Sequence, residues 1–297
     1  MTDCTQCGSP AKFFFRTADR NRKLTGEQFD YFRCRRCGLI FLSPVPADLG
    51  AYYPPNYYEI PKSESELASR AATLHASKLD VVQRHVTRGK LLEIGPAYGL
   101  FAHLAKQAGF DVSVIERDAR CCAFLRDTVK VDVVESDDPV KGLRDLPPLD
   151  VIVLWQVVEH LPDPWSVLEA AARRLRPGGV LILDTPNPSA FQFRVLGRFW
   201  THVDAPRHVT MIPAALLVER MGTLGLPVLS LTSCDRIATG YNGFGWAETF
   251  KSFLSNERWG RAAHVAGRVL AKLLIPIERT GFRGSTYTAV FRKGAAQ

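Results

Sequence analysis

The sequence of 297 residues contains no apolar run as long as the roughly 20 residues that a membrane-spanning helix needs. Its first residues also lack the positively charged and apolar blocks of a secretory signal peptide, and no internal repeat or low-complexity segment follows. These absences predict a soluble, globular, cytoplasmic protein. Because 46% of the residues are apolar, the chain can bury one α/β core and still form one or two smaller modules.

The positive charge of the sequence is unevenly distributed. The net charge is +8, and residues 190–297 alone hold 14 Lys and Arg against 6 Asp and Glu. Residues 1–45 sum to +4, whereas residues 46–189 sum to −4. The excess of basic side chains toward the C-terminus predicts an anionic substrate or surface close to that part of the protein.

The cysteines include two pairs with the spacing of metal ligands. Cys4 and Cys7, and then Cys34 and Cys37, are separated by two residues, and a glycine follows each pair. Two intervening residues let a tight turn direct both thiolates at one tetrahedral ion. We therefore expect a zinc ribbon in residues 1–46, with a structural Zn²⁺ that has no open coordination position. A disulfide pair or a redox Cys-x-x-Cys motif is the alternative.

A glycine loop after a short apolar run indicates a turn that binds a ligand. Residues 91–94 have the pattern of a strand, Gly95, Ala97 and Gly99 lie in a tight turn, and an apolar helix follows. Glycines allow the backbone to approach a ligand closely, and the N-terminus of the helix offers unpaired N–H groups. In the dinucleotide fingerprint Gly-x-Gly-x-x-Gly, a glycine stands at the position of Ala97.

Further strands follow at intervals typical of a parallel α/β sheet. Residues 111–116 form a strand that ends in Glu116, roughly 20 residues past the loop, where a carboxylate can accept two hydrogen bonds from a ribose diol. Other strands are expected at residues 131–135, 149–155 and 180–185, with a helix at residues 165–175.

Together these motifs resemble the class I, Rossmann-like methyltransferases that depend on S-adenosylmethionine. The resemblance covers roughly residues 75–190, and its segments are Glu93-x-Gly95-x-x-x-Gly99, Glu116, residues 150–155, Glu159-His160-Leu161 and Leu175-Arg-Pro-Gly-Gly179. It implies an α/β fold with a mostly parallel sheet whose last strand is antiparallel. The methyltransferase domain would occupy residues 89–297, with a helical insertion at about 237–284.

The resemblance also implies which residues bind the cofactor. An acid after the third strand of the family hydrogen-bonds the adenine amino group, and Asp137 is preferred over Asp138 for this role. His160 would be structural in this family, or alternatively a general base. The expected cofactor-binding residues are Glu93, Gly95, Ala97, Gly99, Phe101, Glu116, Arg117, Asp137, Trp155, Gln156, His160 and Tyr57.

Residues 47–88 are expected to form an aromatic linker and a lid helix. Four tyrosines between residues 52 and 58 lie in a segment that its prolines keep extended, and residues 64–88 have the spacing of an amphipathic helix. In the branch that the sequence resembles, the tyrosine segment closes over the cofactor. Tyr57 or Tyr58 would then contact cofactor or substrate; otherwise the rings only pack the ribbon onto the core.

Residues 199–209 begin with two aromatic residues and continue with a cluster of polar ones. This segment is expected to face the acceptor, as a similar run does in many members of this branch. Imidazole titrates close to neutral pH, so His208 or His202 could accept a proton as the methyl group arrives. Arg207 could clamp an anionic group. The alternative for His208 is that it caps or packs the helix expected at residues 213–224.

The insertion ends in a basic amphipathic helix, residues 258–277. This helix could be a lid over the acceptor, or it could rest on anionic lipid and give the protein a peripheral membrane contact. Alternatively, it packs against the protein's own core or against a second subunit. Both a monomer and a homodimer are compatible with the sequence.

The sequence thus predicts an enzyme that transfers a methyl group from S-adenosylmethionine to a hydroxyl group or an acidic carbon. The acceptor is expected to be a small or lipid-linked anionic metabolite, such as a nucleotide sugar, glycan precursor or natural product. An RNA-directed methyltransferase is the alternative, although the Asn/Asp-Pro-Pro-Tyr/Phe motif of amino-directed base methylases is missing. A third interpretation is a non-catalytic protein that binds a nucleotide and recruits a partner.

Overall fold

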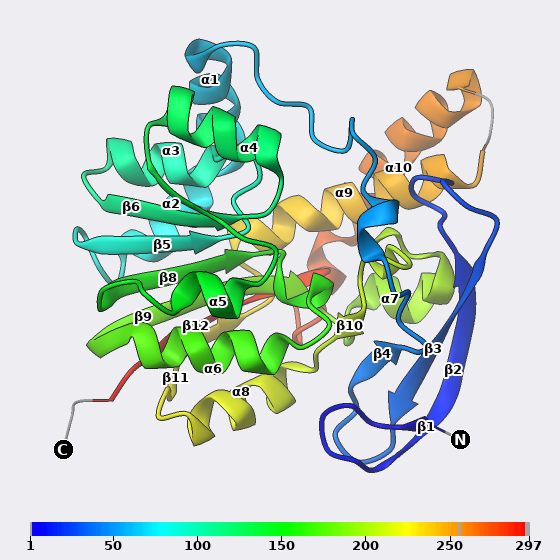
Figure 1. The fold of residues 1–297 in the computed structure, drawn as a ribbon. Coiled ribbons are helices and arrows are strands. Elements are labelled where there is room, and N and C mark those ends of the chain that lie inside the picture. Colours follow the sequence, from blue (N-terminus) through cyan, green and yellow to red (C-terminus); the bar gives the residue numbers. More distant parts are fainter. Residues whose placement is uncertain (1, 255–256, 295–297) are drawn as a thin grey trace.

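A seven-stranded mixed sheet forms the centre of the computed structural model, which describes residues 2–254 and 257–294 (Figure 1). Its strand order is β11-β12-β9-β8-β5-β6-β7. The strands are β5 (Lys90–Ile94), β6 (Asp111–Glu116), β7 (Asp132–Glu135), β8 (Leu149–Trp155), β9 (Leu175–Pro186), β11 (Val228–Thr232) and β12 (Thr286–Arg292). The row from β7 to β9 is parallel, and β12 runs antiparallel to both of its neighbours. The predicted fold class is confirmed.

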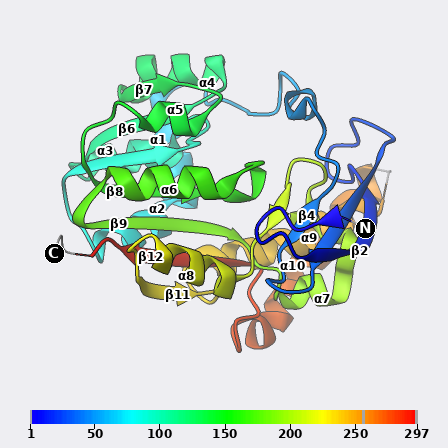
Figure 2. The ribbon, with the colours of Figure 1, turned by 60° about the horizontal axis from the view of Figure 1, so that its bottom comes forward.

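Helices cover both faces of this sheet because successive strand residues point to opposite sides. Leu92 and Ile152 face one layer, and their neighbours Leu91 and Val151 face the other; burial of each such side chain contributes about 1.5–3 kcal/mol. The first layer holds α5 (Pro139–Leu143), α6 (Pro164–Arg174) and α8 (Ala214–Thr223); Figure 2 shows α6 and α8 on the near side. The second layer holds α1 (Glu64–Leu74), α2 (Ala76–Gln83), α3 (Leu100–Gln107), α4 (Ala119–Phe124) and α9 (Arg236–Ser252).

A second, antiparallel sheet is formed mainly by the N-terminal residues. Its order is β1 (Thr2–Asp3), β2 (Pro10–Ala18), β3 (Gln28–Cys34), β4 (Ile40–Leu42) and β10 (Thr210–Met211). The fifth strand comes from the segment that follows β9, where Thr210 pairs with Phe41 and Met211 with Ile40. This ladder fixes the N-terminal module beside the carboxyl ends of the parallel strands (Figure 1).

The segments between the last strands are helical. After β9 the chain forms the short helix α7 (Phe191–Leu196), and between β11 and β12 it forms α9 and α10 (Glu257–Glu278). Helices α9 and α10 pack along each other and lie on the same side of the molecule as the N-terminal sheet (Figure 1). They occupy the position expected for the helical insertion.

The helix expected at residues 64–88 is interrupted in the structure. It is divided into α1 and α2 at His75, whose φ of −119° and ψ of 0° lie outside the helical region, and α2 ends at Gln83. The break turns Lys78 inward, where it is buried with its ammonium 5.3 Å from the centroid of the Trp155 ring. Apolar spacing could not reveal this break, because a lysine is normally expected on the solvent side of a helix.

Candidate functional site

Two cavities lie side by side at the carboxyl ends of the parallel strands. The first, the glycine-loop cavity, measures about 920 Å³ and is bounded by the turn after β5, the end of β6 and the tyrosine segment. The second, the histidine cavity, measures about 1100 Å³ and is bounded by the β2–β3 loop, residues 201–208 and helices α9 and α10. Tyr57, Gln156 and His160 line both cavities. Ligands in the two cavities would therefore meet at these three side chains.

The backbone of the glycine loop forms one wall of the glycine-loop cavity. Gly95 lines the cavity with a φ of +68°, and a Cβ there would lie 2.9 Å from Cγ2 of Val157. Ala97 also has a positive φ, of 53°. At Gly99, a Cβ would lie 2.5 Å from Cδ2 of Leu125. A side chain at Gly95 would thus crowd Val157, which lines the same cavity, whereas Ala97 and Gly99 shape the turn behind it.

Glu116, at the end of β6, directs its carboxylate into this turn. Its Oε2 accepts a hydrogen bond from the N–H of Ala97 at 3.0 Å, and its Oε1 accepts from the N–H groups of Arg117 and Asp118 at 2.8 and 2.9 Å. Burial raises the pKa of Glu116, and these N–H groups oppose that shift. Because an ionised carboxylate has about four acceptor sites and three are taken by these N–H groups, about one is left to accept a hydrogen bond from a ribose hydroxyl.

Asp137 and Asp138 have different surroundings. Asp138 accepts hydrogen bonds from the N–H groups of Val140 and Lys141 and caps α5. Asp137 lines the glycine-loop cavity, as does Arg117, whose guanidinium carbon lies 5.2 Å from the centroid of the Tyr53 ring. This placement favours Asp137 over Asp138 as the acceptor for an amino group of a ligand.

Three buried acids with unpartnered oxygens lie behind the wall of the cavity. These atoms are Oε2 of Glu93, Oε1 of Glu159 and Oδ1 of Asp184. Burial raises the pKa of Glu93 to about 8, that of Glu159 to about 8 and that of Asp184 to about 7. The charge of Lys78 opposes the shift at Glu93 and Asp184. A cationic ligand nearby would lower these raised pKa values, because its charge favours the ionised carboxylates. The acids therefore favour binding of a cation.

Phe101 and Trp155, both expected at the cofactor, lie behind the cavities. Phe101, in α3, and Trp155, at the end of β8, are buried and pack edge to face with ring centroids 5.3 Å apart. Neither is among the side chains that line the two cavities. The next residue, Gln156, has a φ of 57°, lines both cavities and donates from Nε2 to Asp184 at 3.0 Å.

Four imidazoles, those of His160, His202, His208 and His264, line the histidine cavity, and a hydrogen bond fixes the tautomer of His208. The rings of His160 and His208 lie 4.5 Å apart. Nδ1 of His208 lies 2.8 Å from the carbonyl oxygen of His202, and Nδ1 of His160 lies 3.1 Å from that of Arg207. A carbonyl oxygen only accepts, so Nδ1 of His208 carries the proton and its Nε2 has a lone pair, whereas Nδ1 of His160 also lies 3.0 Å from the hydroxyl oxygen of Tyr53. Burial lowers the pKa of His208 to about 3 and that of His202 to about 4.

Asp204 carries a negative charge beside these histidines. Its Oδ2 lies 4.0 Å from Nε2 of His208, and Arg207 donates to both of its carboxylate oxygens, at 3.0 and 2.7 Å. Arg207 is buried and also donates to Asp19 at 2.7 Å. The guanidinium is therefore engaged within the protein and is not placed to act as the anion clamp expected from the sequence.

Replacing Arg207 with methionine should lower the free energy of unfolding by about 3–5 kcal/mol, because two buried carboxylates lose their counter-charge. Urea unfolding measures the effect. Arg16→Met is the matched control, since Arg16 pairs with Asp30 at a similar distance but is well exposed. The control should change stability little, and equal losses in the two variants would contradict the structural role of Arg207.

The same substitution, Arg207→Met, should change how the free energy of unfolding depends on pH. Burial would raise the pKa of Asp204, but the hydrogen bonds and charge of Arg207 outweigh it and hold that pKa below its usual value of 3.8. A lowered pKa in the folded state contributes stability that is present above about pH 4 and is lost as the pH falls further. The difference in free energy of unfolding between the wild type and Arg207→Met should therefore decrease as the pH falls from about 4 to about 2.

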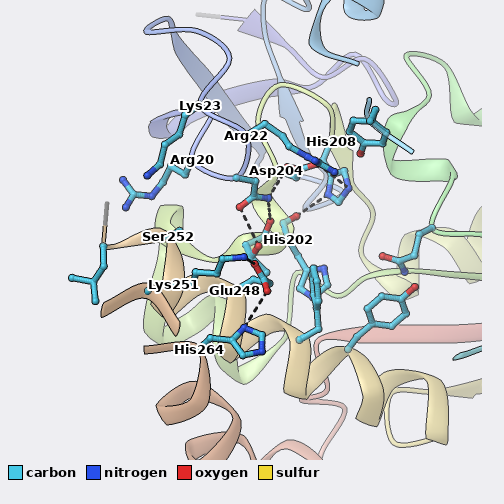
Figure 3. A pocket seen from close by; sticks show the side chains of 18 of the residues that line it. Arg20, Arg22, Lys23, His202, Asp204, His208, Glu248, Lys251, Ser252 and His264 are labelled. Carbon is cyan, nitrogen blue, oxygen red and sulfur yellow. Dashed lines mark hydrogen bonds and ion pairs between the residues drawn. The ribbon is translucent and has the colours of Figure 1, made fainter. Parts of the chain in front are cut away.

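Basic side chains surround the histidine cavity (Figure 3). Arg20, Arg22 and Lys23 come from the loop between β2 and β3, and Lys251 and Arg261 come from α9 and α10. Sequence reasoning missed this group because its members belong to segments more than 200 residues apart. The local signal is the run of three basic residues among positions 20–23.

The four cysteines of the N-terminal module converge on one point. The Sγ atoms of Cys4 and Cys37 are 3.7 Å apart, those of Cys7 and Cys34 are 3.5 Å apart, and those of Cys7 and Cys37 are 3.8 Å apart. A tetrahedral ion with Zn–S distances of about 2.3 Å requires sulfur separations of about 3.8 Å. The cluster therefore fits a zinc ion, whereas a disulfide would bring two sulfurs to about 2.05 Å.

Comparison with known proteins gives relatives for the central part of the chain. A family model described as a methyltransferase domain matches residues 67–231. The chain is also similar to the ubiquinone biosynthesis O-methyltransferases of Xanthomonas campestris pv. campestris and Xylella fastidiosa, with 29% and 27% identity over 133 residues. These alignments cover 42% of this chain and 56% and 54% of those proteins. The chain thus spans about half the length of these relatives.

Two solved structures have a similar fold. A SAM-dependent methyltransferase from Archaeoglobus fulgidus has a TM-score of 0.51 and 19% sequence identity, over 76% of this chain and 94% of that one. The cyclase SpnF has a TM-score of 0.51 and 16% identity, over 74% of this chain and 82% of that one. Since one is a methyltransferase and the other a cyclase, the likeness shows the fold, and the reaction must be argued from the site.

Proposed function

This chain belongs to the family of the methyltransferase domain, and we propose that it transfers a methyl group from S-adenosylmethionine to a hydroxyl oxygen or an acidic carbon of an anionic metabolite. The observation that carries this proposal is the junction of the two cavities at Tyr57, Gln156 and His160. A methyl donor in the glycine-loop cavity would adjoin an acceptor in the histidine cavity, which is the arrangement that direct transfer needs.

The residues of the glycine-loop cavity fit S-adenosylmethionine. Gly95 lines the cavity where a Cβ would crowd Val157, Glu116 has about one acceptor site left for a ribose hydroxyl, and Asp137 can accept from the adenine amino group. Glu93 and Asp184, whose oxygens are unpartnered and whose pKa values are raised by burial, would ionise more readily beside a cationic methionine end, because a nearby cation lowers the pKa of an acid. When bound, the cofactor supplies a methyl group on a positively charged sulfur, which is already a strong electrophile.

The protein then has to align the acceptor and take up its proton. The hydrogen bond from Nδ1 of His208 to the carbonyl oxygen of His202 leaves Nε2 of His208 as the atom that can take up the proton, and the charge of Asp204 opposes the burial that lowers the pKa of this ring to about 3. Asp204, 4.0 Å from Nε2, stabilises the imidazolium that forms. We assign this role to His208 rather than to His202, whose buried Nε2 has no hydrogen-bonding partner in the described structure.

The charges around the histidine cavity support an anionic acceptor. Arg20, Arg22 and Lys23 lie on one side, and Lys251 and Arg261 lie on the other. Several cations around one cavity favour a ligand with phosphate or carboxylate groups. Nucleotide sugars and lipid-linked glycan precursors carry a hydroxyl group and such an anion in one molecule, so they are the acceptors that we propose.

Replacing His208 with glutamine should lower turnover by about 100- to 10,000-fold, the usual contribution of a positioned general base. Binding of S-adenosylhomocysteine should stay close to that of the wild type, because His208 lines the histidine cavity. Release of S-adenosylhomocysteine would be measured with a panel of nucleotide sugars and polyprenyl-phosphate sugars, and binding by isothermal titration. His85→Gln, outside both cavities, is the matched control.

Two outcomes would contradict this assignment. Binding of S-adenosylhomocysteine without turnover of any acceptor would indicate a non-catalytic nucleotide-binding protein. Glu159, His160 and His208 also bring three potential ligand atoms within 4.8 Å of one another. Turnover that requires added Mg²⁺ or Mn²⁺, and that Glu159→Gln abolishes as fully as His208→Gln, would assign these side chains to a metal site instead of proton transfer.

One observation favours methylation of RNA as a second candidate function. Phe13 and Phe14 are 56% and 40% exposed and lie with Arg33, Arg35 and Arg36 around a hollow of about 550 Å³ on the N-terminal module. Exposed rings beside basic side chains are a common surface for single-stranded nucleic acid. RNA binding that weakens steeply with salt, together with methyl transfer to RNA and to none of the metabolites, would favour this candidate.

A further inference from the structure

Helix α10 is fixed against the rest of the protein by one of its three faces. The buried residues on this face include Gly260, Gly267, Ala271 and Glu278. Gly267 allows close packing, because a Cβ there would lie 2.7 Å from Cα of Ala247 in α9. Glu278 accepts a hydrogen bond from Nε1 of Trp246 at 2.9 Å. These contacts set the rotation of α10 about its axis and leave its other two faces outside.

The second face is an exposed apolar stripe. Val265, Val269, Leu273 and Ile277 recur every four residues, and their exposed fractions are 60, 54, 70 and 37%. A row of large aliphatic side chains on one helix face is unfavourable in contact with water alone, because burial would recover hydration free energy from each of them. Helix α10 thus packs on the protein through its buried face, as one of the alternatives from the sequence expects, and this stripe is left outside that contact.

The third face is basic. At 100° per residue, Arg261, Arg268 and Lys272 fall on one side of the apolar stripe along the same helix. The sequence has no Asp or Glu from residue 258 to residue 277. The outward surface of α10 thus combines apolar side chains with positive charge alone, and its binding partner should be both apolar and anionic.

We infer that α10 lies flat on an anionic lipid surface, with the apolar stripe among the headgroups and the basic face against lipid phosphates. Helices with this division of faces bind at membrane interfaces, and each basic residue adds electrostatic attraction to anionic lipid. In the described part of the chain no helix combines the length and the apolar content needed to cross a bilayer. A second copy of the chain would cover the stripe less well, because it would bring Arg261, Arg268 and Lys272 close to their own counterparts.

The position of α10 links the lipid surface to the histidine cavity. Arg261 and Val265 belong to the outward faces of the helix and also line that cavity. An acceptor carried on a lipid could therefore enter the cavity at the membrane surface. This link to the acceptor rests on the proposed function, whereas the contact between α10 and lipid does not depend on it.

Vesicle sedimentation tests the inference with the full-length protein. The wild type should bind vesicles of 30% phosphatidylglycerol in phosphatidylcholine, and should bind at least tenfold more weakly to pure phosphatidylcholine or in 0.5 M NaCl. The double substitution Val269→Asp and Leu273→Asp should reduce binding at least tenfold. The matched control is Leu229→Asp with Leu231→Asp, two exposed aliphatic residues on β11.

Binding of S-adenosylhomocysteine by the wild type, the α10 variant and the β11 control separates this inference from the proposed function. Retained ligand binding with loss of vesicle binding only in the α10 variant supports the inference. Equal binding to neutral and anionic vesicles, or an α10 variant that still sediments with them, overturns it. The inference would also be overturned if the wild type did not bind vesicles but formed a dimer, and Val269→Asp dissociated that dimer. The stripe would then be a subunit contact. Vesicle binding without ligand binding would count against the proposed function alone.

Discussion

Replacing Cys34 with serine should remove zinc from the N-terminal module and abolish turnover of the acceptor, with a smaller effect on binding of S-adenosylhomocysteine. Structural zinc sites of this type contribute on the order of 10 kcal/mol of apparent binding free energy to folding. Without the ion, the ends of β2, β3 and β4 lose their common anchor. The loop with Arg20, Arg22 and Lys23 would then no longer be held at the histidine cavity.

The control for this experiment is Cys234→Ser. Cys234 is a half-buried cysteine outside the cluster, and its thiol donates to the carbonyl oxygen of Arg279. Zinc content would be measured by mass spectrometry, and stability by thermal unfolding. A Cys34→Ser protein that retains one zinc per chain, or that unfolds at the wild-type temperature, would show that the four sulfurs do not hold a structural ion.

The parts of the fold that could be predicted from the sequence have signals confined to a few neighbouring residues. A strand that ends in Glu116, a turn with Gly95, and cysteines two residues apart each depend on local spacing. In the structure, Glu116 and Gly95 line one cavity, and the four cysteine sulfurs converge. Local patterns are sufficient here because neighbouring strands of a parallel sheet place their carboxyl ends at the same edge.

The remaining features depend on contacts between distant segments. Arg20 and Arg22 become part of the histidine cavity because the pairing of β4 with β10 and the hydrogen bonds of Asp19 and Asn21 to residues 201–207 hold the β2–β3 loop there. Phe101 and Trp155 have the sequence positions of ligand contacts, but their rings pack on each other behind the wall. Lys78 is buried because α1 ends at His75. The spacing of residues along one helix or strand carries no information on such contacts.

Replacing Gly95 with valine should abolish detectable binding of S-adenosylhomocysteine. Gly95 has a φ of +68°, where an L-residue costs roughly 1–2 kcal/mol, and its Cβ would lie 2.9 Å from Val157. The new side chain would also occupy the wall against which the ligand lies. Glu116→Gln should have a smaller effect, about 10- to 150-fold weaker binding, because it keeps the shape but loses a charged hydrogen-bond acceptor worth about 1.5–3 kcal/mol.

Gly109→Val is the matched control for Gly95→Val. Gly109 also has a positive φ, of 88°, but a Cβ there meets no atom within 4 Å. Both variants place a valine at a positive φ, which is unfavourable for an L-residue, but only Gly95→Val adds a side chain at the cavity. Isothermal titration, with circular dichroism to check the fold, separates loss of the cavity from loss of the structure. Equal affinity for S-adenosylhomocysteine in the two variants would mean that the cofactor binds elsewhere. The proposed function would then fail. The predictions on zinc and on lipid binding do not depend on this result and have their own tests.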